Sequence, residues 1–144
     1  MQVNKSPVVI VDADAIVAQA FPNDSNHQRA VAISNRLNDL NAKAIYPASA
    51  VLEATTVLQA RLNSGETAYG TAVVFSDPNV QVAEINQSIL INALNYFTPT
   101  TSKKNTLFDC VVMAVANENK ADAIFSFDKL YKKNGFKLAS ELIK

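Results

Sequence analysis

Cysteine, excess charge of either sign and long apolar runs are scarce in this sequence, and each shortage excludes a class of protein. The single cysteine, Cys110, excludes an internal disulfide and fits a reducing compartment. It lies in the apolar run FDCVVMAVA, so we expect a small core residue there rather than a nucleophile. Thirteen basic and thirteen acidic residues give no net charge, which argues against a protein that coats nucleic acid through bulk charge.

Targeting and membrane signals are missing as well. No segment resembles a signal peptide, and no run approaches the roughly 18 apolar residues of a membrane span. We therefore expect a cytoplasmic protein with no membrane partner. The chain has no repeats or linkers, and its 144 residues, 49% of them hydrophobic, are enough for one domain with a substantial core. We predict a single domain over residues 1–144.

Apolar runs alternate with amphipathic segments along the chain, which predicts βαβ units with parallel strands. Strands are expected at 7–11, 44–46, 80–85 and 123–127, with a weak fifth at 136–139. Helices are expected up to about 20, from 24 or 25 to about 40, over 48–62 and 66–75, from 86, and from 106. These elements predict an α/β fold: a three-layer α/β/α sandwich around a central parallel sheet of about five strands.

The first predicted strand ends in a carboxylate. The run VVIV has no polar face, which is typical of a central parallel strand that is covered on both sides. Asp12 follows it directly, although a carboxylate at the end of a buried strand is costly unless it is paired. Open α/β sheets bind their ligands at the carboxyl ends of the strands. No purely structural role explains Asp12 well, so it is the first candidate for a functional site.

Three more carboxylates fall on the same predicted edge. Glu53 lies in the first turns of the helix after the second strand, Asp109 in the first turn of its helix, and Asp128 directly after the fourth strand. Strand ends and helix starts share one edge in right-handed βαβ units. Each acid also has a structural interpretation: Glu53 favours its helix dipole, Asp109 forms a capping box with Thr106, and Asp128 caps the next helix.

As a set, these acids predict a metal site. Several carboxylates without histidine or cysteine among them repel one another. Mg²⁺ or Mn²⁺ relieves that repulsion, prefers oxygen ligands, and keeps several waters for substrate phosphates. Such an ion activates water and stabilises the charge on a phosphodiester during in-line attack.

In these four segments the sequence resembles PIN domains, most of all the VapC-type toxins. The marks are Asp12 after its strand, Glu53 in PASAVLEATTVL, Asp109 in TLFDCVVMAVA and Asp128 in AIFSFDKLY. The resemblance covers nearly the whole chain. It implies cleavage of single-stranded RNA by the four acids, with Mg²⁺ or Mn²⁺ on Asp12, Asp109 and Asp128, often in a homodimer. For VapC-type toxins it also implies a small antitoxin protein that blocks the site.

Two neighbours of the acids carry further expectations. Ser126 stands where the family often has Thr or Ser beside its last Asp, so the resemblance implies that it supports the ligands from behind. Asp14 departs from the family, which often has Asn or Ser there. It is either an extra ligand or the cap of the next helix, and we favour the cap.

Basic and aromatic residues near the predicted site have two interpretations. Lys103 and Lys104 precede Asp109, and Lys129 follows Asp128. They are either solvated or in contact with RNA phosphates, in which case binding is salt-sensitive. Tyr131 either stacks on a base or packs as an amphipathic side chain.

Three rival functions remain compatible with the sequence. The run VVIVDADAIVA also resembles the start of haloacid-dehalogenase-like phosphatases, in which one Asp is the nucleophile and the next an acid. Those enzymes usually continue with Gly or Thr, whereas Ile16 and Val17 follow here and the chain has three glycines. The second rival is a housekeeping PIN nuclease without an antitoxin, and the third is a non-catalytic PIN-like interaction module. The presence of all four acids argues against the interaction module.

Overall fold

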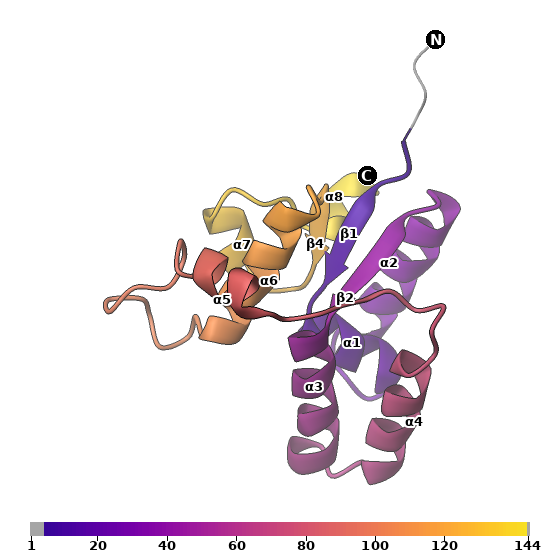
Figure 1. The fold of residues 1–144 in the computed structure, drawn as a ribbon. Helices are drawn as coiled ribbons and strands as arrows, with labels where there is room; N and C mark the ends of the chain where they lie inside the picture. Colours follow the sequence, from indigo (N-terminus) through magenta and orange to yellow (C-terminus); the bar gives the residue numbers. More distant parts are fainter. Residues whose placement is uncertain (1–4, 144) are drawn as a thin grey trace.

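The computed structural model describes residues 5–143 and shows a parallel sheet flanked by helices (Figure 1). Its strands are β1 (Val8–Val11), β2 (Lys43–Pro47), β3 (Val82–Ala83) and β4 (Ala123–Phe125), in the order β3-β2-β1-β4, and every neighbouring pair is parallel. Its α-helices are α1 (Ala13–Ala20), α2 (His27–Asp39), α3 (Ala48–Thr56), α4 (Gly65–Phe75), α5 (Gln87–Ala93), α6 (Leu107–Glu118), α7 (Leu130–Lys133) and α8 (Ala139–Leu142). A π-helical segment, η1 (Val57–Arg61), continues directly from α3.

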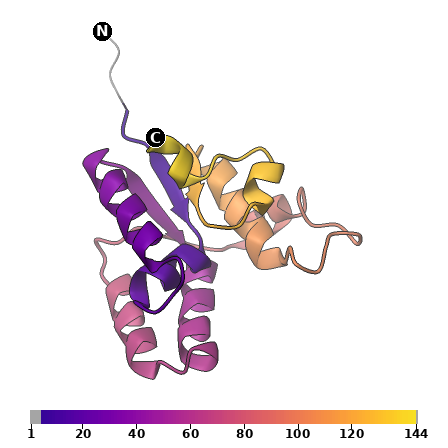
Figure 2. The same ribbon diagram turned by 180° about the vertical axis from the view of Figure 1, so that it is seen from behind.

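The central strand β1 separates two helical layers, as the three-layer prediction requires. Successive strand side chains point to opposite faces of a sheet. Val9 and Val11 accordingly pack with residues of α1 to α4, whereas Ile10 packs with Ile45 and residues of α5 and α6. Figures 1 and 2 show these layers from opposite sides. Cys110 is 1% exposed in the second layer, which confirms it as a core residue.

The sheet is smaller than predicted. The described residues form four strands, and the expected fifth is reduced to one isolated parallel bridge between Ile124 and Leu138. The reason is that α8 begins at Ala139 and ends the extended stretch after one bridge. The predicted strand over 80–85 also shrinks to two residues, because it lies at the sheet edge and pairs only with β2.

The helix ends were predicted well, but one helix interior was not. Asn41 and Asn63 adopt left-handed φ values of 54° and 50° directly after the two helix ends predicted at about 40 and at 62. The helix expected over 48–62 is α-helical only to Thr56 and then widens into η1. None of the described helices is long and apolar enough to cross a membrane.

A substitution at Ile10 tests the central place of β1. Ile10 is fully buried, and its strand pairs with both β2 and β4. Ile10→Ala should lower the free energy of unfolding by about 2–5 kcal/mol, because it leaves a cavity that the sheet cannot close. Ile91→Ala on α5 removes the same atoms from a residue that is 61% exposed and serves as the control. Chemical denaturation measures both, and equal losses would contradict this packing.

Candidate active site

The four predicted acids come within electrostatic range of one another beyond the carboxyl ends of β1 and β4. Asp12 follows β1, Glu53 lies in α3, Asp109 lies in the first turn of α6, and Asp128 follows β4. The charges of Asp12 and Asp109 both raise the pKa of Glu53, and the charge of Asp128 raises that of Asp109. The chain therefore gathers all four from separate elements, as the sheet-edge argument predicts.

Asp12 is the most enclosed of the four, with 7% of its surface exposed. One carboxylate oxygen, Oδ1, accepts a hydrogen bond from the Ala13 N–H at 2.7 Å. The other, Oδ2, accepts from the Tyr131 hydroxyl at 2.7 Å and from the Ser126 hydroxyl at 3.2 Å. Burial and the charge of Asp14 raise its pKa to about 7, although these hydrogen bonds oppose the shift. Asp12 is also the N-cap of α1, a structural role that the sequence pattern did not predict.

Asp14 does not have the favoured role of a helix cap. Because Asp12 is the N-cap, Asp14 already lies in the first turn of α1. Its Oδ2 accepts hydrogen bonds from the Phe127 N–H at 2.8 Å and from the Ser126 hydroxyl at 3.0 Å. Its Oδ1 is buried and has no hydrogen-bond partner. Asp14 therefore ties α1 to the segment after β4 and leaves one oxygen without a partner. Burial raises its pKa to about 6.

Ser126 connects Asp12 and Asp14, at the start of α1, with Asp128 after β4. Its hydroxyl lies within hydrogen-bonding distance of Asp12 and Asp14, and it accepts a hydrogen bond from the Asp128 N–H at 3.1 Å. A hydroxyl has one proton, so it donates to one of the two carboxylates at a time. The side chain is 6% exposed and lies behind the acids, where the family resemblance puts it.

Tyr131 is the site residue whose role the sequence pattern did not predict. Its side chain is fully buried, so of the two interpretations of Tyr131 the packed side chain agrees with the structure and stacking on a base does not. Its hydroxyl contacts Asp12 and also lowers the pKa of Asp109 by hydrogen bonding. Burial and the charges of Asp12 and Asp109 raise the pKa of Tyr131 far above its usual range, so it remains a donor. The signal that could have revealed this role is that a buried tyrosine hydroxyl usually needs a partner.

Asp109 and Asp128 each accept a backbone hydrogen bond at the start of a helix. Asp109 accepts a hydrogen bond from the Thr106 N–H at 3.0 Å, as in the predicted capping box. Asp128 is not the N-cap of α7, which is Lys129, but it accepts a hydrogen bond from the Leu130 N–H at 2.9 Å at the start of that helix. Burial and the charge of Asp128 nevertheless raise the pKa of Asp109. These hydrogen bonds therefore fix the two carboxylates in place without removing them from the cluster.

Glu53 completes the cluster without a neutralising partner. Burial and the charges of Asp12 and Asp109 raise its pKa to about 7, against a smaller opposing effect of Arg61. The ion pairs within residues 5–143 are Arg36–Asp39 and Lys132–Glu141, so no cation forms a salt bridge with a site acid there. The carboxylates of the cluster therefore repel one another, and no ion pair within residues 5–143 compensates for this repulsion.

The donor chemistry fits a hard divalent cation. Every donor in the cluster is an oxygen, and the buried Oδ1 of Asp14 has no other partner. Within residues 5–143, however, no group of three or more His, Cys, Asp or Glu side chains is arranged to hold a metal ion. A Mg²⁺ ion bound through fewer side chains would complete its coordination with waters, which is how Mg²⁺ is usually bound.

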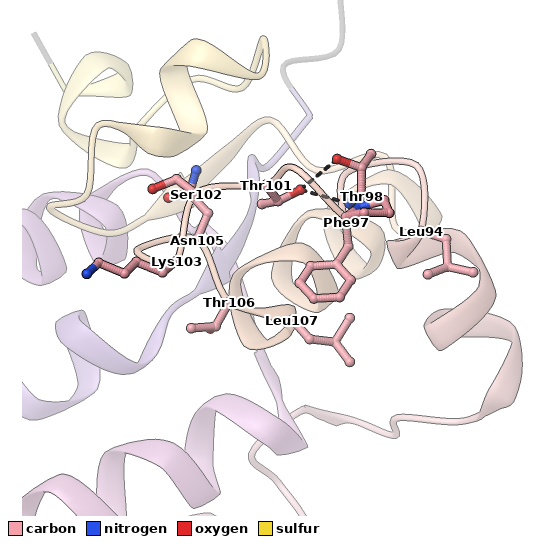
Figure 3. Close-up of a pocket in the computed structure, with 10 residues that line it drawn as sticks. Leu94, Phe97, Thr98, Thr101, Ser102, Lys103, Asn105, Thr106 and Leu107 are labelled. Atoms are coloured by element: carbon pink, nitrogen blue, oxygen red, sulfur yellow. Dashed lines mark hydrogen bonds between the residues drawn. The ribbon is translucent and has the colours of Figure 1, made fainter.

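Of the three lysines expected near the site, Lys103 lines a cavity. This cavity of about 620 Å³ lies between the end of α5 and the start of α6. Figure 3 shows Phe97 and Leu107 close together on one side of it and Lys103 extending away from them. Lys104 and Lys129 are exposed on the surface.

The comparisons with known proteins agree with this architecture. The PIN domain profile matches residues 9–137, which is most of the chain. The chain belongs to the PIN domain family. The crystal structure of Mycobacterium tuberculosis VapC20, a sarcin–ricin loop cleaving toxin, superposes on this PIN domain with a TM-score of 0.76. The two are 18% identical over 89% of this chain and 95% of VapC20, a likeness that shows the shared fold. No curated protein sequence matches the chain.

Family membership bears on the phosphatase interpretation. The PIN match includes the segment around Asp12 and Asp14 on which that interpretation rested. In the structure Asp12 accepts hydrogen bonds from Ser126 and Tyr131, which follow β4 of the PIN-like sheet. The resemblance to haloacid-dehalogenase-like phosphatases therefore loses its support.

The raised pKa values predict how stability depends on pH. Folding raises the pKa of Asp12 from 3.8 and that of Glu53 from 4.5, each to about 7. The folded protein then binds more protons than the unfolded chain between about pH 4 and pH 7, so stability falls as pH rises through that window. Metal-free protein should melt at a lower temperature at pH 8 than at pH 5.5. Glu53→Gln should weaken this dependence, whereas Glu118→Gln, at the exposed far end of α6, should leave it unchanged. A parent protein that is more stable at pH 8 would contradict the arrangement.

Proposed function

We propose that this PIN domain is a metal-dependent endoribonuclease that cleaves single-stranded RNA. The observation that supports it most is the cluster of Asp12, Glu53, Asp109 and Asp128 at one end of the sheet. Burial and repulsion between carboxylates raise the pKa values of Asp12, Glu53 and Asp109. Clusters of oxygen donors suit Mg²⁺ or Mn²⁺. When bound, such an ion activates water and stabilises the charge of a phosphodiester in its transition state.

In this proposal each side chain of the site has its own role. Asp12, Asp109 and Asp128 bind the metal, directly or through its water ligands, since within residues 5–143 no three such side chains form a ready cage. The hydroxyls of Tyr131 and Ser126 hold the Asp12 carboxylate in one orientation, and the Thr106 N–H does the same for Asp109. Glu53 has a pKa of about 7, so near neutral pH it can take a proton from the attacking water and release it again.

Contacts to the RNA strand come from the rim of the site. Lys103 lines the cavity beside α6, and Lys104 and Lys129 are exposed on segments that adjoin Asp109 and Asp128. We propose that these ammonium groups bind RNA phosphates. The affinity for RNA should then fall as the salt concentration rises.

We further propose that the protein is the toxin of a toxin–antitoxin pair and acts as a homodimer. The similarity in fold to the VapC20 toxin supports this. An arginine of a small antitoxin protein would satisfy the unpaired acids in place of the metal, because its fork of donors matches carboxylates. A housekeeping PIN nuclease without an antitoxin is the alternative.

Cleavage of RNA in defined metal conditions tests the activity. Purified protein should cleave single-stranded RNA with Mg²⁺ or Mn²⁺ and stop when EDTA is added. Glu53→Gln should lower the rate by about 10²–10⁴-fold, because it removes a group that exchanges protons. Glu118→Gln should cleave like the parent. Cleavage that persists in EDTA, or that survives in Glu53→Gln, would refute this mechanism.

Expression in cells tests the toxin assignment. The parent should slow growth, whereas Glu53→Gln should not. A small protein encoded beside it should restore growth and co-purify with the parent. Normal growth together with RNA cleavage in vitro would favour the housekeeping nuclease.

A further inference from the structure

A second cavity opens beside the acid cluster, between η1 and the start of α6. It encloses about 420 Å³, which falls in the range of small-ligand sites. The residues that line it include Glu53 of the acid cluster, Arg61, Phe108 and Thr106, the N-cap of α6. The cavity therefore combines one catalytic carboxylate, one cation and one aromatic ring.

The π-helical segment explains why Arg61 faces this cavity. Arg61 follows Glu53 by eight residues, which in an α-helix of 3.6 residues per turn is about 2.2 turns, so the two would diverge. In η1 the Leu62 N–H bonds instead to the Val57 carbonyl at 3.0 Å, five residues back. A π-helical turn contains more residues than an α-helical turn, so the eight residues from Glu53 to Arg61 complete close to two turns. Arg61 therefore lies on the same side of the helix as Glu53. The charge of Arg61 accordingly lowers the pKa of Glu53.

The two other side chains are exposed and suited to a ligand. Arg61 is exposed and takes part in neither of the salt bridges found in residues 5–143. Phe108 is 49% exposed, although large aromatic side chains are normally buried, and it directly precedes Asp109. A guanidinium binds phosphate oxygens through paired donors, and an exposed ring offers a stacking face to a base.

We propose that this cavity binds one nucleotide of the RNA strand beside the phosphate that is cleaved, with Arg61 on a backbone phosphate and Phe108 stacked on the base. The inference rests on the proposed ribonuclease function and extends it, since it gives the strand a defined path past Glu53. Because a stacked ring accepts any base, this position contributes affinity with little sequence preference. An acidic peptide would also pair with Arg61, but its carboxylates would not stack on the Phe108 ring and would be repelled by the acid cluster.

Binding of a fluorescent single-stranded RNA oligonucleotide, measured by anisotropy in EDTA, tests the cavity apart from catalysis. Arg61→Gln should weaken binding on the order of tenfold, because a charge-assisted hydrogen bond is lost. It should also reduce the slope of log affinity against log salt by about 1. Phe108→Ala should weaken binding on the order of tenfold without changing that slope. Arg61→Lys should restore the slope and only part of the affinity.

Matched controls and cleavage kinetics complete the test. Arg36→Gln removes a cation of α2 that pairs with Asp39, and Tyr69→Ala removes a ring of α4 that is 74% exposed. Both should bind RNA like the parent. In cleavage with Mn²⁺, Arg61→Gln and Phe108→Ala should raise KM while kcat changes by less than about threefold. Thermal melts verify that each variant is folded.

The outcomes separate the two proposals. If the parent neither binds nor cleaves RNA, the ribonuclease function and this inference both fail. If the parent cleaves RNA but both cavity variants bind it like the controls, the function stands and the nucleotide site is refuted. If Arg61→Gln keeps RNA binding and loses a co-purifying protein, the cavity is a protein interface and the inference is refuted as well.

Discussion

The burial of a carboxylate at the end of β1 is the constraint on which the rest of this site depends. Asp12 is 7% exposed, and a charge so far from water must find donors within the protein. It finds them in the backbone of α1, in Ser126 after β4 and in Tyr131 of α7. One side chain therefore joins the first and last strands of the domain, and residues more than 110 positions apart become parts of one site.

Those donors do not remove the electrostatic cost. The pKa values of Asp12 and Glu53 stay near 7 because burial removes both carboxyls from water, Asp14 repels Asp12, and Asp12 and Asp109 repel Glu53. No cation within residues 5–143 forms a salt bridge with Asp12 or Glu53. A protein selected for stability alone would place apolar residues here. The local hydrogen bonds at Asp109 and Asp128 show how the fold tolerates the repulsion: backbone N–H groups fix the carboxylates while their charges remain. The proposed metal would supply the missing positive charge.

The sequence predicted the fold because strand burial and helix starts are local patterns. The VVIV run indicated a central strand, and the handedness of βαβ units then gathered Asp12, Glu53, Asp109 and Asp128 without knowledge of any contact. Features that depend on how separate helices and strands pack together could not be predicted from the sequence. The sequence pattern favoured Asp14 as the helix cap, whereas the observed start of α1 makes Asp12 the N-cap. Tyr131 became a donor because α7 turns it inward.

The distribution of positive charge shows why composition alone said little about binding RNA. A lysine or arginine inside the cluster would neutralise the acids and compete with a metal for the same oxygens. The cations sit outside it instead: Lys103 lines one cavity and Arg61 the other. Thr106 lines both cavities, and its N–H also holds Asp109. The N-cap residue of α6 thus lies between the two cavities proposed to contact RNA, and its N–H orients the Asp109 carboxylate. A chain with no net charge can in this way present a negative centre with a positive rim.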